Sequence, residues 1–215
     1  MWAKLNSDKD TIEEIIVSPK SMTVDGITHP RTLFSLWTDA ERKAIGIVPV
    51  TTSGTSLDER FYIEKDEAFA IAGDKNSVVR TIGEKVADKK LADEDATDED
   101  GNKLKDEDGN QMIIYGLKTQ AKNKATNNAN ARLQGFNWLI QRKVTADTAI
   151  PSAVVTYMAA VRTAHGSICT AIDNASDMDA FIVLHTTEYN EDGSVKTVAK
   201  VNDWPDDSGV KGNRR

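Results

Sequence analysis

The sequence predicts an α+β protein: a small N-terminal antiparallel-sheet domain with one short helix, an acidic hairpin or loop insert, and a C-terminal helical hairpin domain. Three observations lead to this prediction. Short apolar runs alternate with turn residues over 1–85, an acidic segment poor in large apolar residues covers 86–112, and apolar residues recur at helical spacing over 113–215. With 215 residues and 39% hydrophobic content, the chain suits one globular domain or two small ones.

Turn and cap residues divide the first module. Asp25-Gly26 favours a two-residue turn inside a hairpin over 21–29. Thr38 and Glu41 have the spacing of a capping box, and Gly46 suits the left-handed position after a helix, so a short helix is expected between them. Strands are expected at 2–5, 13–17, 47–51, 61–71 and 77–85, the last two flanking the turn 73–76.

The net charge of −7 is concentrated in one segment. Residues 88–110 hold ten acids and four lysines, a balance of −6, whereas the rest of the chain is close to neutral. The segment repeats the pentapeptide Asp-Glu-Asp-Gly-Asn at 98–102 and 106–110. It cannot bury enough apolar surface to offset its ordering entropy, which predicts a mobile loop or a protruding hairpin. A chain without a basic face is not expected to bind nucleic acid.

Helical spacing dominates the last module. One stripe predicts a helix from Gly116 onward: Ala121, Ala125, Ala129, Leu133, Phe136 and Ile140. A second stripe predicts a helix that starts at Pro151: Val154, Met158, Val161, His165, Ile168 and Ile172. The short connection between them predicts an antiparallel helical hairpin. A third helix is expected at 177–185, capped by Ser176, and a β-hairpin at 189–201 around Asp192-Gly193.

The Asp-Gly-Asn repeats suggest calcium, and the register of an EF-hand loop tests that interpretation. If Gly101 is loop position six, position one is Ala96, which cannot ligate a cation. If Gly109 is position six, Leu104 and Tyr115 stand where the first and last ligands belong. Tight turns therefore explain the repeats better, and only a weak, non-specific cation site stays open. No cofactor or metal is expected.

No catalytic pattern emerges from the remaining residues. His29, His165 and His185 lack metal-ligand spacing, and no nucleophile elbow, phosphate loop or dinucleotide fingerprint occurs. The lone Cys169 excludes an internal disulfide and has no evident activating base in the sequence. A quiet, partly buried thiol is expected there, while an intermolecular disulfide stays open. The chain is accordingly not expected to be an enzyme.

Neither secretion nor membrane insertion is expected. The first residues are polar or charged where a signal peptide would be apolar, as Lys4, Asp8 and Asp10 illustrate. The mean hydropathy is −0.46, and no run approaches the roughly 20 apolar residues that a membrane-spanning helix needs.

An ordered set of residues in the last module carries a family resemblance. It consists of Leu133, Asn137-Trp138, Arg142, Ile150-Pro151, Tyr157, Ala160-Val161-Arg162 and Asp203-Trp204-Pro205. This set resembles the tail-assembly-chaperone-like domain at the C-termini of many tailed-bacteriophage proteins, over about residues 130–205. Val154 departs from the family pattern, where a tryptophan is common, and Met158 departs where an arginine is common. The stretch 30–37, followed by 38–47, also looks like N-terminal modules of such phage proteins.

The resemblance implies a non-enzymatic structural component of a phage tail, at the baseplate, neck or fibre attachment, made in the bacterial host cytoplasm. It implies other tail or tail-fibre proteins as partners, with a homo-oligomer left open. Partner-binding residues would be Trp138, Tyr157, Arg162, Trp204 and Pro205. An alternative is a tail or tail-fibre assembly chaperone that does not remain in the virion, and a hydrolase is a third, disfavoured class. From the residues alone, the tryptophans could also simply anchor small cores.

Overall fold

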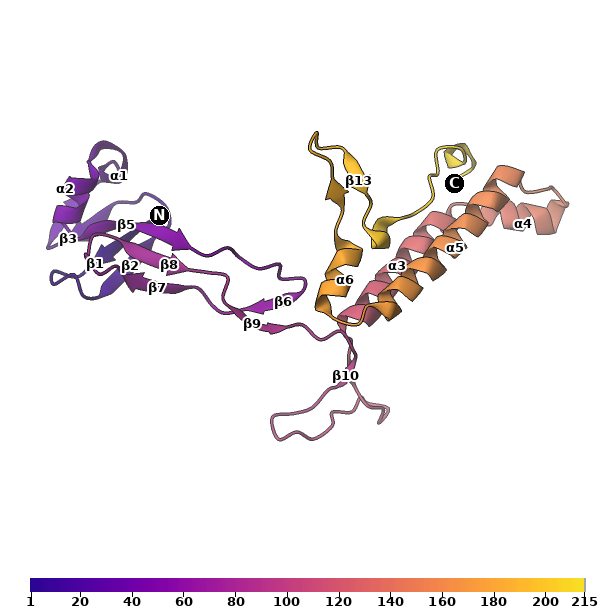
Figure 1. Cartoon of the computed structure of the whole chain (residues 1–215), viewed down its shortest axis with the longest axis horizontal. Helices are drawn as coiled ribbons and strands as arrows, with labels where there is room; N and C mark the ends of the chain where they lie inside the picture. Colours follow the sequence, from indigo (N-terminus) through magenta and orange to yellow (C-terminus); the bar gives the residue numbers. More distant parts are fainter. Residues whose placement is uncertain (215) are drawn as a thin grey trace. The chain divides into compact units, whose positions relative to one another are not determined.

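The computed structural model describes residues 1–214 and contains both a sheet-rich part and a helical part, so the predicted α+β class is confirmed (Figure 1). The chain divides into two compact units, Met1–Asp88 and Lys89–Arg215, and the acidic segment belongs almost wholly to the second. The elements of the first unit are β1 (Trp2–Leu5), β2 (Ile12–Ile16), β3 (Met22–Val24), β4 (Ile27–His29), α1 (Leu33–Leu36), α2 (Asp39–Ala44), β5 (Ile47–Ser53), β6 (Tyr62–Glu64), β7 (Ala68–Ile71), β8 (Val78–Thr81) and β9 (Lys85–Asp88).

A five-stranded sheet in the order β2-β1-β5-β8-β7 organises the first unit. Its strands bury residues on both faces, as period-two alternation requires. Ile47 packs with Leu33 and Phe34 of α1 on one face, while its neighbour Val48 packs with Ala3 on the other. The first face is thus covered by α1 and the β3–β4 hairpin, and the second cluster is built from the strands themselves.

The first unit differs from the predicted antiparallel sheet with one short helix in three details. β5 and β8 pair in parallel, with Val50 opposite Val78, because the intervening chain crosses over and returns through β7. The predicted long strands are each split, since β7 pairs with β8 while β6 pairs separately with β9. The helix that was not predicted is α1, which is one turn long and has no capping-box signal in the sequence.

Arg42 holds the two short helices together. One guanidinium nitrogen donates to the carbonyl oxygens of Leu33, Phe34 and Trp37 at 2.6–3.2 Å, and the other donates to Asp39 at 2.6 Å. Arg42 thereby supplies donors to the carbonyls at the end of α1, of which that of Leu33 also accepts from the amide of Trp37. The predicted capping box of α2 is present, and Gly46 has a φ of +78° as expected.

Two glycines permit a close backbone crossing after the parallel ladder. Gly54 and Gly83 have φ values of +90° and +81°. A Cβ on Gly54 would come within 2.1 Å of the carbonyl oxygen of Ile82, and one on Gly83 within 2.0 Å of that of Thr55. Only glycine fits these positions, where the two chain segments leave the sheet and continue toward β6 and β9.

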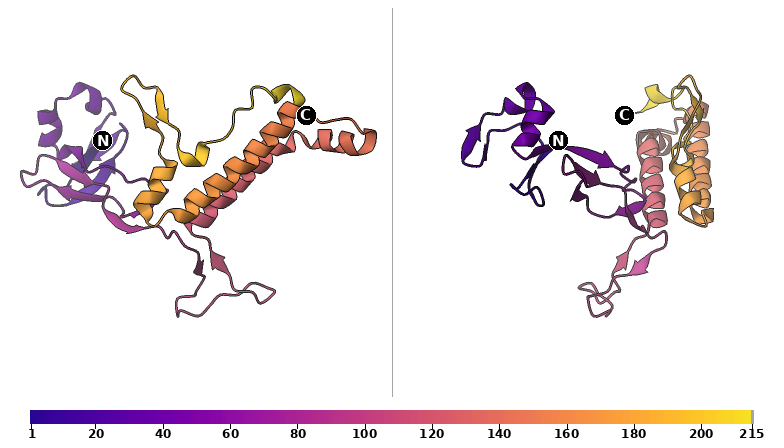
Figure 2. Two further views of the ribbon diagram at one scale, coloured as in Figure 1. Left: turned by 45° about the vertical axis from the view of Figure 1, so that its right-hand side comes forward. Right: turned by 60° about the vertical axis from the view of Figure 1, so that its left-hand side comes forward.

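The second unit is built on two long helices. Its elements are β10 (Glu94–Asp95), β11 (Ile113–Ile114), α3 (Leu117–Gln134), α4 (Asn137–Ala146), α5 (Ser152–Asn174), α6 (Met178–His185), β12 (Glu188–Tyr189), β13 (Val195–Thr197) and the 3-10 turns η1 (Lys200–Asn202) and η2 (Lys211–Asn213). Figure 2 shows α3 and α5 side by side in both views. The start of α3 meets the end of α5, since Lys122 pairs with Asp173, so the predicted helical hairpin is antiparallel.

Three predicted details of this unit are wrong. The first helix ends at Gln134 and restarts as α4, so Ile140 leaves the buried stripe and is 40% exposed. Asp177, not Ser176, caps α6 by accepting from the amide of Ala180, while Ser176 donates to the Asp177 carboxylate. Pro151 stands one position before the first residue of α5.

The acidic segment forms a three-armed module, called the knob below (residues 94–115). β10 and β11 make its stem, and two smaller arms are closed by the pairs Thr97–Lys103 and Lys105–Gln111. At the junction, Leu104 donates to the carbonyl of Ala96, Ala96 to that of Met112, and Met112 to that of Leu104, at 2.8–2.9 Å. Ala96, Leu104 and Met112 are eight positions apart, because the sequence around the pentapeptide repeats over residues 97–104 and 105–112. Each of these eight-residue repeats forms one of the two smaller arms. The hairpin alternative was therefore the better description of this segment.

Replacing Gly54 by alanine should destabilise the first unit. The new Cβ would clash with the carbonyl of Ile82 in a backbone conformation that alanine adopts with strain, at an expected cost of at least about 2 kcal/mol. Hydrogen exchange of the β5 and β8 amides measures this loss. Gly73→Ala is the matched control, because Gly73 has no positive φ and no neighbour within 4 Å of its would-be Cβ. Equal exchange in both variants would contradict the crossing described here.

Candidate functional site

The residues predicted to bind a partner converge on one end of the helical hairpin. A single apolar cluster there is built around Phe136, Leu139, Val154, Tyr157 and Val161. Leu133, Trp138, Ile150 and Trp204 pack against its margin. Six of the thirteen ordered family-like residues, spread over some 70 residues of sequence, thus belong to this one cluster or its margin. Val154, where the family pattern commonly has tryptophan, is completely buried in it.

The C-terminal segment returns to this end of the helices and closes the cluster (Figure 1). Val210 is buried in the cluster, and the indole nitrogen of Trp138 donates to the carbonyl of Asn213 at 2.9 Å. The sequence suggested only a polar tail here. It gave one usable signal, the isolated apolar Val210 within a polar stretch, and that signal is too weak to predict a return of the chain.

Arg214 anchors the returning segment. Its guanidinium donates to the hydroxyl of Tyr157 at 3.2 Å and pairs with the Asp207 carboxylate at 3.0 Å. It also lies 5.4 Å from the centre of the Phe136 ring, within the range of a cation–π contact. Gly135 leaves room for it, since a Cβ there would come within 3.1 Å of the arginine side chain. Sequence analysis missed both Arg214 and Asp207.

Trp204 has a comparable intramolecular role. Its indole nitrogen donates to the carbonyl of Val201 at 3.2 Å, and the guanidinium of Arg132 lies 5.2 Å from its ring centre. Pro205 follows, half-buried. Tyr157, Trp138 and Trp204 therefore hold their own chain together, which leaves little of Tyr157 accessible to another protein. The structure brings three of the five predicted residues, Trp138, Tyr157 and Trp204, to the core or its margin.

Arg162 is the predicted residue that faces outward. It lines an open groove where α3, α4 and α5 meet, together with Asn130, Leu133, Gln134, Asn137, Ile140 and Met158. Of these lining residues, Arg162 alone is charged, and Ile140 presents an apolar side chain that is 40% exposed. A guanidinium, three amides and an exposed aliphatic group suit the backbone and carboxylates of a protein partner. This groove is the candidate interaction site of the unit.

Cys169 lies beside a histidine that the sequence analysis did not connect with it. The Nε2 atom of His165 is 3.5 Å from the Cys169 sulfur and 3.1 Å from the hydroxyl of Thr126. A thiol next to an imidazole is the beginning of a nucleophile–base pair. However, burial and then the charge of Asp173 raise the pKa of Cys169, which opposes thiolate formation. The expected quiet thiol fits this environment, and the intermolecular disulfide stays a prediction.

The acids of the knob order its turns. The Asp98 carboxylate accepts from the amides of Asp100 and Asn102, and Asp106 accepts equivalently from Asp108 and Asn110. Hydrogen bonds from Asn102 and Asn110 lower the pKa values of Asp98 and Asp106. These carboxylates thus stay ionised, which is unsuited to a general acid. In the described part of the chain, no group of three or more potential ligand side chains is placed to hold a metal ion.

The other histidines have structural surroundings. His29 contacts the Trp37 ring edge-on at 5.2 Å, and the Nδ1 atom of His185 lies 2.9 Å from the carbonyl oxygen of Phe181. Within residues 1–214, no helix combines the length and apolarity needed to cross a membrane.

Comparison of the chain with protein-family models, with curated proteins and with solved structures finds no match in any of the three.

Replacing Trp138 by phenylalanine should loosen the returning segment. The change removes the donor to Asn213 and keeps most of the ring, so a loss of about 1 kcal/mol of local stability is expected. Hydrogen exchange should accelerate about fivefold at the amides of Val210, Lys211 and Asn213. Trp2→Phe in the first unit is the control and should leave these amides unchanged. An unaltered rate in Trp138→Phe would show that the bond does not hold the segment.

Cys169 should react slowly while the protein is folded. Its raised pKa lowers the thiolate fraction at any given pH, and its burial limits access. Alkylation by iodoacetamide at pH 8 should be at least about tenfold slower than in the chain unfolded with urea. Asp173→Asn removes the second cause of the raised pKa and should speed the folded-state reaction. Equal rates in folded and unfolded chains would contradict this account.

Proposed function

We propose that this chain is a non-enzymatic structural component of a bacteriophage tail, at the baseplate, neck or fibre attachment, and that it acts through protein–protein packing. The observation that carries the proposal is that six of the family-like residues meet at one cluster at the end of the helical hairpin. Leu133 and Trp204, near the two ends of this set in the sequence, both pack against that cluster. Their meeting supports the resemblance as a signature of a packed domain.

The outward-facing residues at the same end supply the contact surface. Arg162 and Ile140 lie in the groove beside the cluster, where a partner's side chains would find both a cation and an apolar group. The helical core behind the groove fixes their positions, since Met158 and Leu133 line the groove and also belong to the cluster or its margin. A rigid groove suits permanent packing in an assembled particle.

An assembly chaperone that leaves before the particle is complete is the second candidate. The knob favours it, because eight acids and two lysines within residues 94–110 would keep a complex with an unfinished fibre soluble. Like-charged copies would also resist edge-to-edge association of fibre strands. The two candidates differ in whether the polypeptide stays in the virion.

The proposal predicts this polypeptide in purified virions at fixed stoichiometry, measured by quantitative mass spectrometry of washed particles. The variants Arg162→Glu and Ile140→Asp should each lower its incorporation severalfold, because they place a carboxylate in the groove. Val155→Asp is the matched control, since Val155 is an exposed apolar residue of α5 outside the groove, and it should be incorporated normally.

Absence from washed virions would overturn the structural role. Co-expression with a tail-fibre protein then tests the alternative. A fibre protein that folds and trimerises equally well without this chain would contradict chaperoning.

A further inference from the structure

The stem of the knob exposes an apolar strand that no part of the described chain covers. Residues 112–115 read Met-Ile-Ile-Tyr, and their side chains are 47%, 42%, 60% and 56% exposed. Successive residues of a strand point to opposite faces, so apolar groups face solvent on both sides of the ribbon. Four consecutive exposed apolar residues are unusual on a surface that is otherwise strongly polar.

The backbone of this strand also has an edge that no second strand of the described chain covers, where the Tyr115 carbonyl accepts a hydrogen bond from the Gln120 side chain at 2.6 Å. The stem is a two-stranded sheet within residues 1–214, so β11 has a strand neighbour, β10, on one side only. The amide of Ala96 donates to the carbonyl of Met112, so these two residues form a hydrogen-bonded pair. In an antiparallel ladder such pairs alternate with pairs that are not hydrogen-bonded, so Glu94 and Ile114 are the next hydrogen-bonded pair and Asp95 and Ile113 are not one. The backbone N–H groups of Ile113 and Tyr115 consequently point to the outer edge. Such an edge is a template for one more strand.

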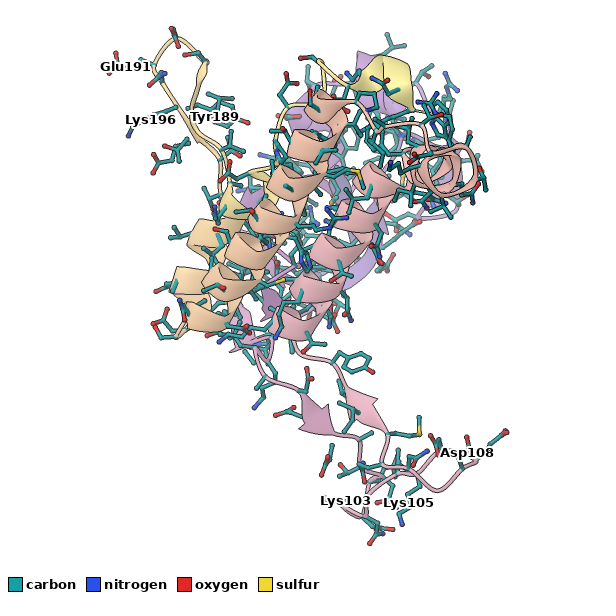
Figure 3. The ribbon with its side chains drawn as sticks, turned by 90° about the vertical axis from the view of Figure 1, so that its right-hand side faces the viewer. Lys103, Lys105, Asp108, Tyr189, Glu191 and Lys196 are labelled. Carbon is teal, nitrogen blue, oxygen red and sulfur yellow. The ribbon has the colours of Figure 1, made fainter. Side chains whose placement is uncertain are left out.

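The charge around the edge selects the strand that can bind. The opposite strand is Glu94–Asp95, and both smaller arms present further acids, leaving the knob at −6 over residues 94–110. Figure 3 shows Lys103, Lys105 and Asp108 at the far end of this segment, away from the helices. Lys103 already pairs with Asp95. Nucleic acid, anionic lipid and a second copy of the knob would all be repelled at low salt.

We propose that the outer edge of β11 binds an extended, basic segment of a partner protein by strand addition. The segment's backbone pairs with Ile113 and Tyr115, its apolar side chains cover Ile113 and Ile114, and its lysines or arginines face the acids of the arms. This inference rests on the proposal that the chain works by protein–protein packing, and it names one surface and the chemistry of the partner.

The test uses the full-length, ¹⁵N-labelled protein and a synthetic nine-residue peptide of alternating lysine and valine. Saturable binding should slow hydrogen exchange at Ile113 and Tyr115, because both amides become hydrogen-bonded to the added strand. A second peptide with the same lysines and prolines in place of the valines carries equal charge and cannot pair as a strand. It should give no protection.

Two variants locate the interaction. Ile113→Pro deletes the outward N–H without removing a ladder bond to β10, and should abolish protection at Tyr115. Neutralising four arm acids should weaken binding about tenfold at low salt and less at high salt. The four substitutions are Glu99→Gln, Asp100→Asn, Glu107→Gln and Asp108→Asn. The matched control neutralises four exposed acids elsewhere and should bind normally. Its substitutions are Glu59→Gln, Asp66→Asn, Asp179→Asn and Glu191→Gln.

Three results would overturn the inference: no saturable binding, equal binding of the proline peptide, or protection of the β11 edge by self-association of the protein alone. None of them bears on whether virions contain the polypeptide. A failure here with the polypeptide present in virions would leave the proposed function standing and reject only this surface.

Discussion

Two helices cannot enclose a core by themselves, and this constraint shapes the whole second unit. Where α3 and α5 meet, α3 contributes only the small buried residues Ala125 and Ala129. Alanines let the helices approach closely, yet they bury little apolar area. The chain therefore breaks α3 at Gly135, inserts Phe136 completely into the gap, and returns its C-terminal segment over the same end. The side chains of Arg214, Trp138 and Trp204 hold this arrangement together through hydrogen bonds to other parts of the unit.

Charge is distributed so that packing surfaces and solvent-directed surfaces are separate. Three arginines gather around aromatic rings at the end of the helical hairpin: Arg132, Arg142 and Arg214, each about 5 Å from a ring centre. The acids lie instead in the knob, where the carboxylates of Asp98 and Asp106 accept hydrogen bonds from nearby backbone amides. Side-chain to backbone hydrogen bonds can thus order a segment that has almost no core. The repeat of eight residues supplies the same bonds twice.

The sequence predicted elements that depend on local signals. The capping box at Thr38, the turn at Asp25-Gly26 and the buried stripe of α5 all follow from residues close together in the chain. What it could not predict depends on distant residues. The parallel pairing of β5 with β8 depends on which strands become neighbours in the sheet, and here β8 lies between β5 and β7. Ile140 is exposed because α3 ends at Gln134 and the chain continues as a separate helix, α4. Arg214 gave no signal, since its aromatic partners Tyr157 and Phe136 are 57 and 78 positions away.

The predicted site residues likewise include some whose role the sequence could not reveal, because that role depends on residues distant in the chain. Aromatic residues that recur in a family pattern are as readily explained by packing as by binding, and Tyr157 and Trp204 are held by their own chain. Arg162 differs because its side chain is exposed and lines the open groove outside the buried cluster. The exposed apolar residues lead to a similar conclusion. Two-stranded ribbons are marginal alone, yet β10–β11 and β12–β13 carry exposed Ile114, Tyr189 and Val195. Elements that expose apolar groups without gaining a core are therefore the places at which a contact with another protein surface is expected.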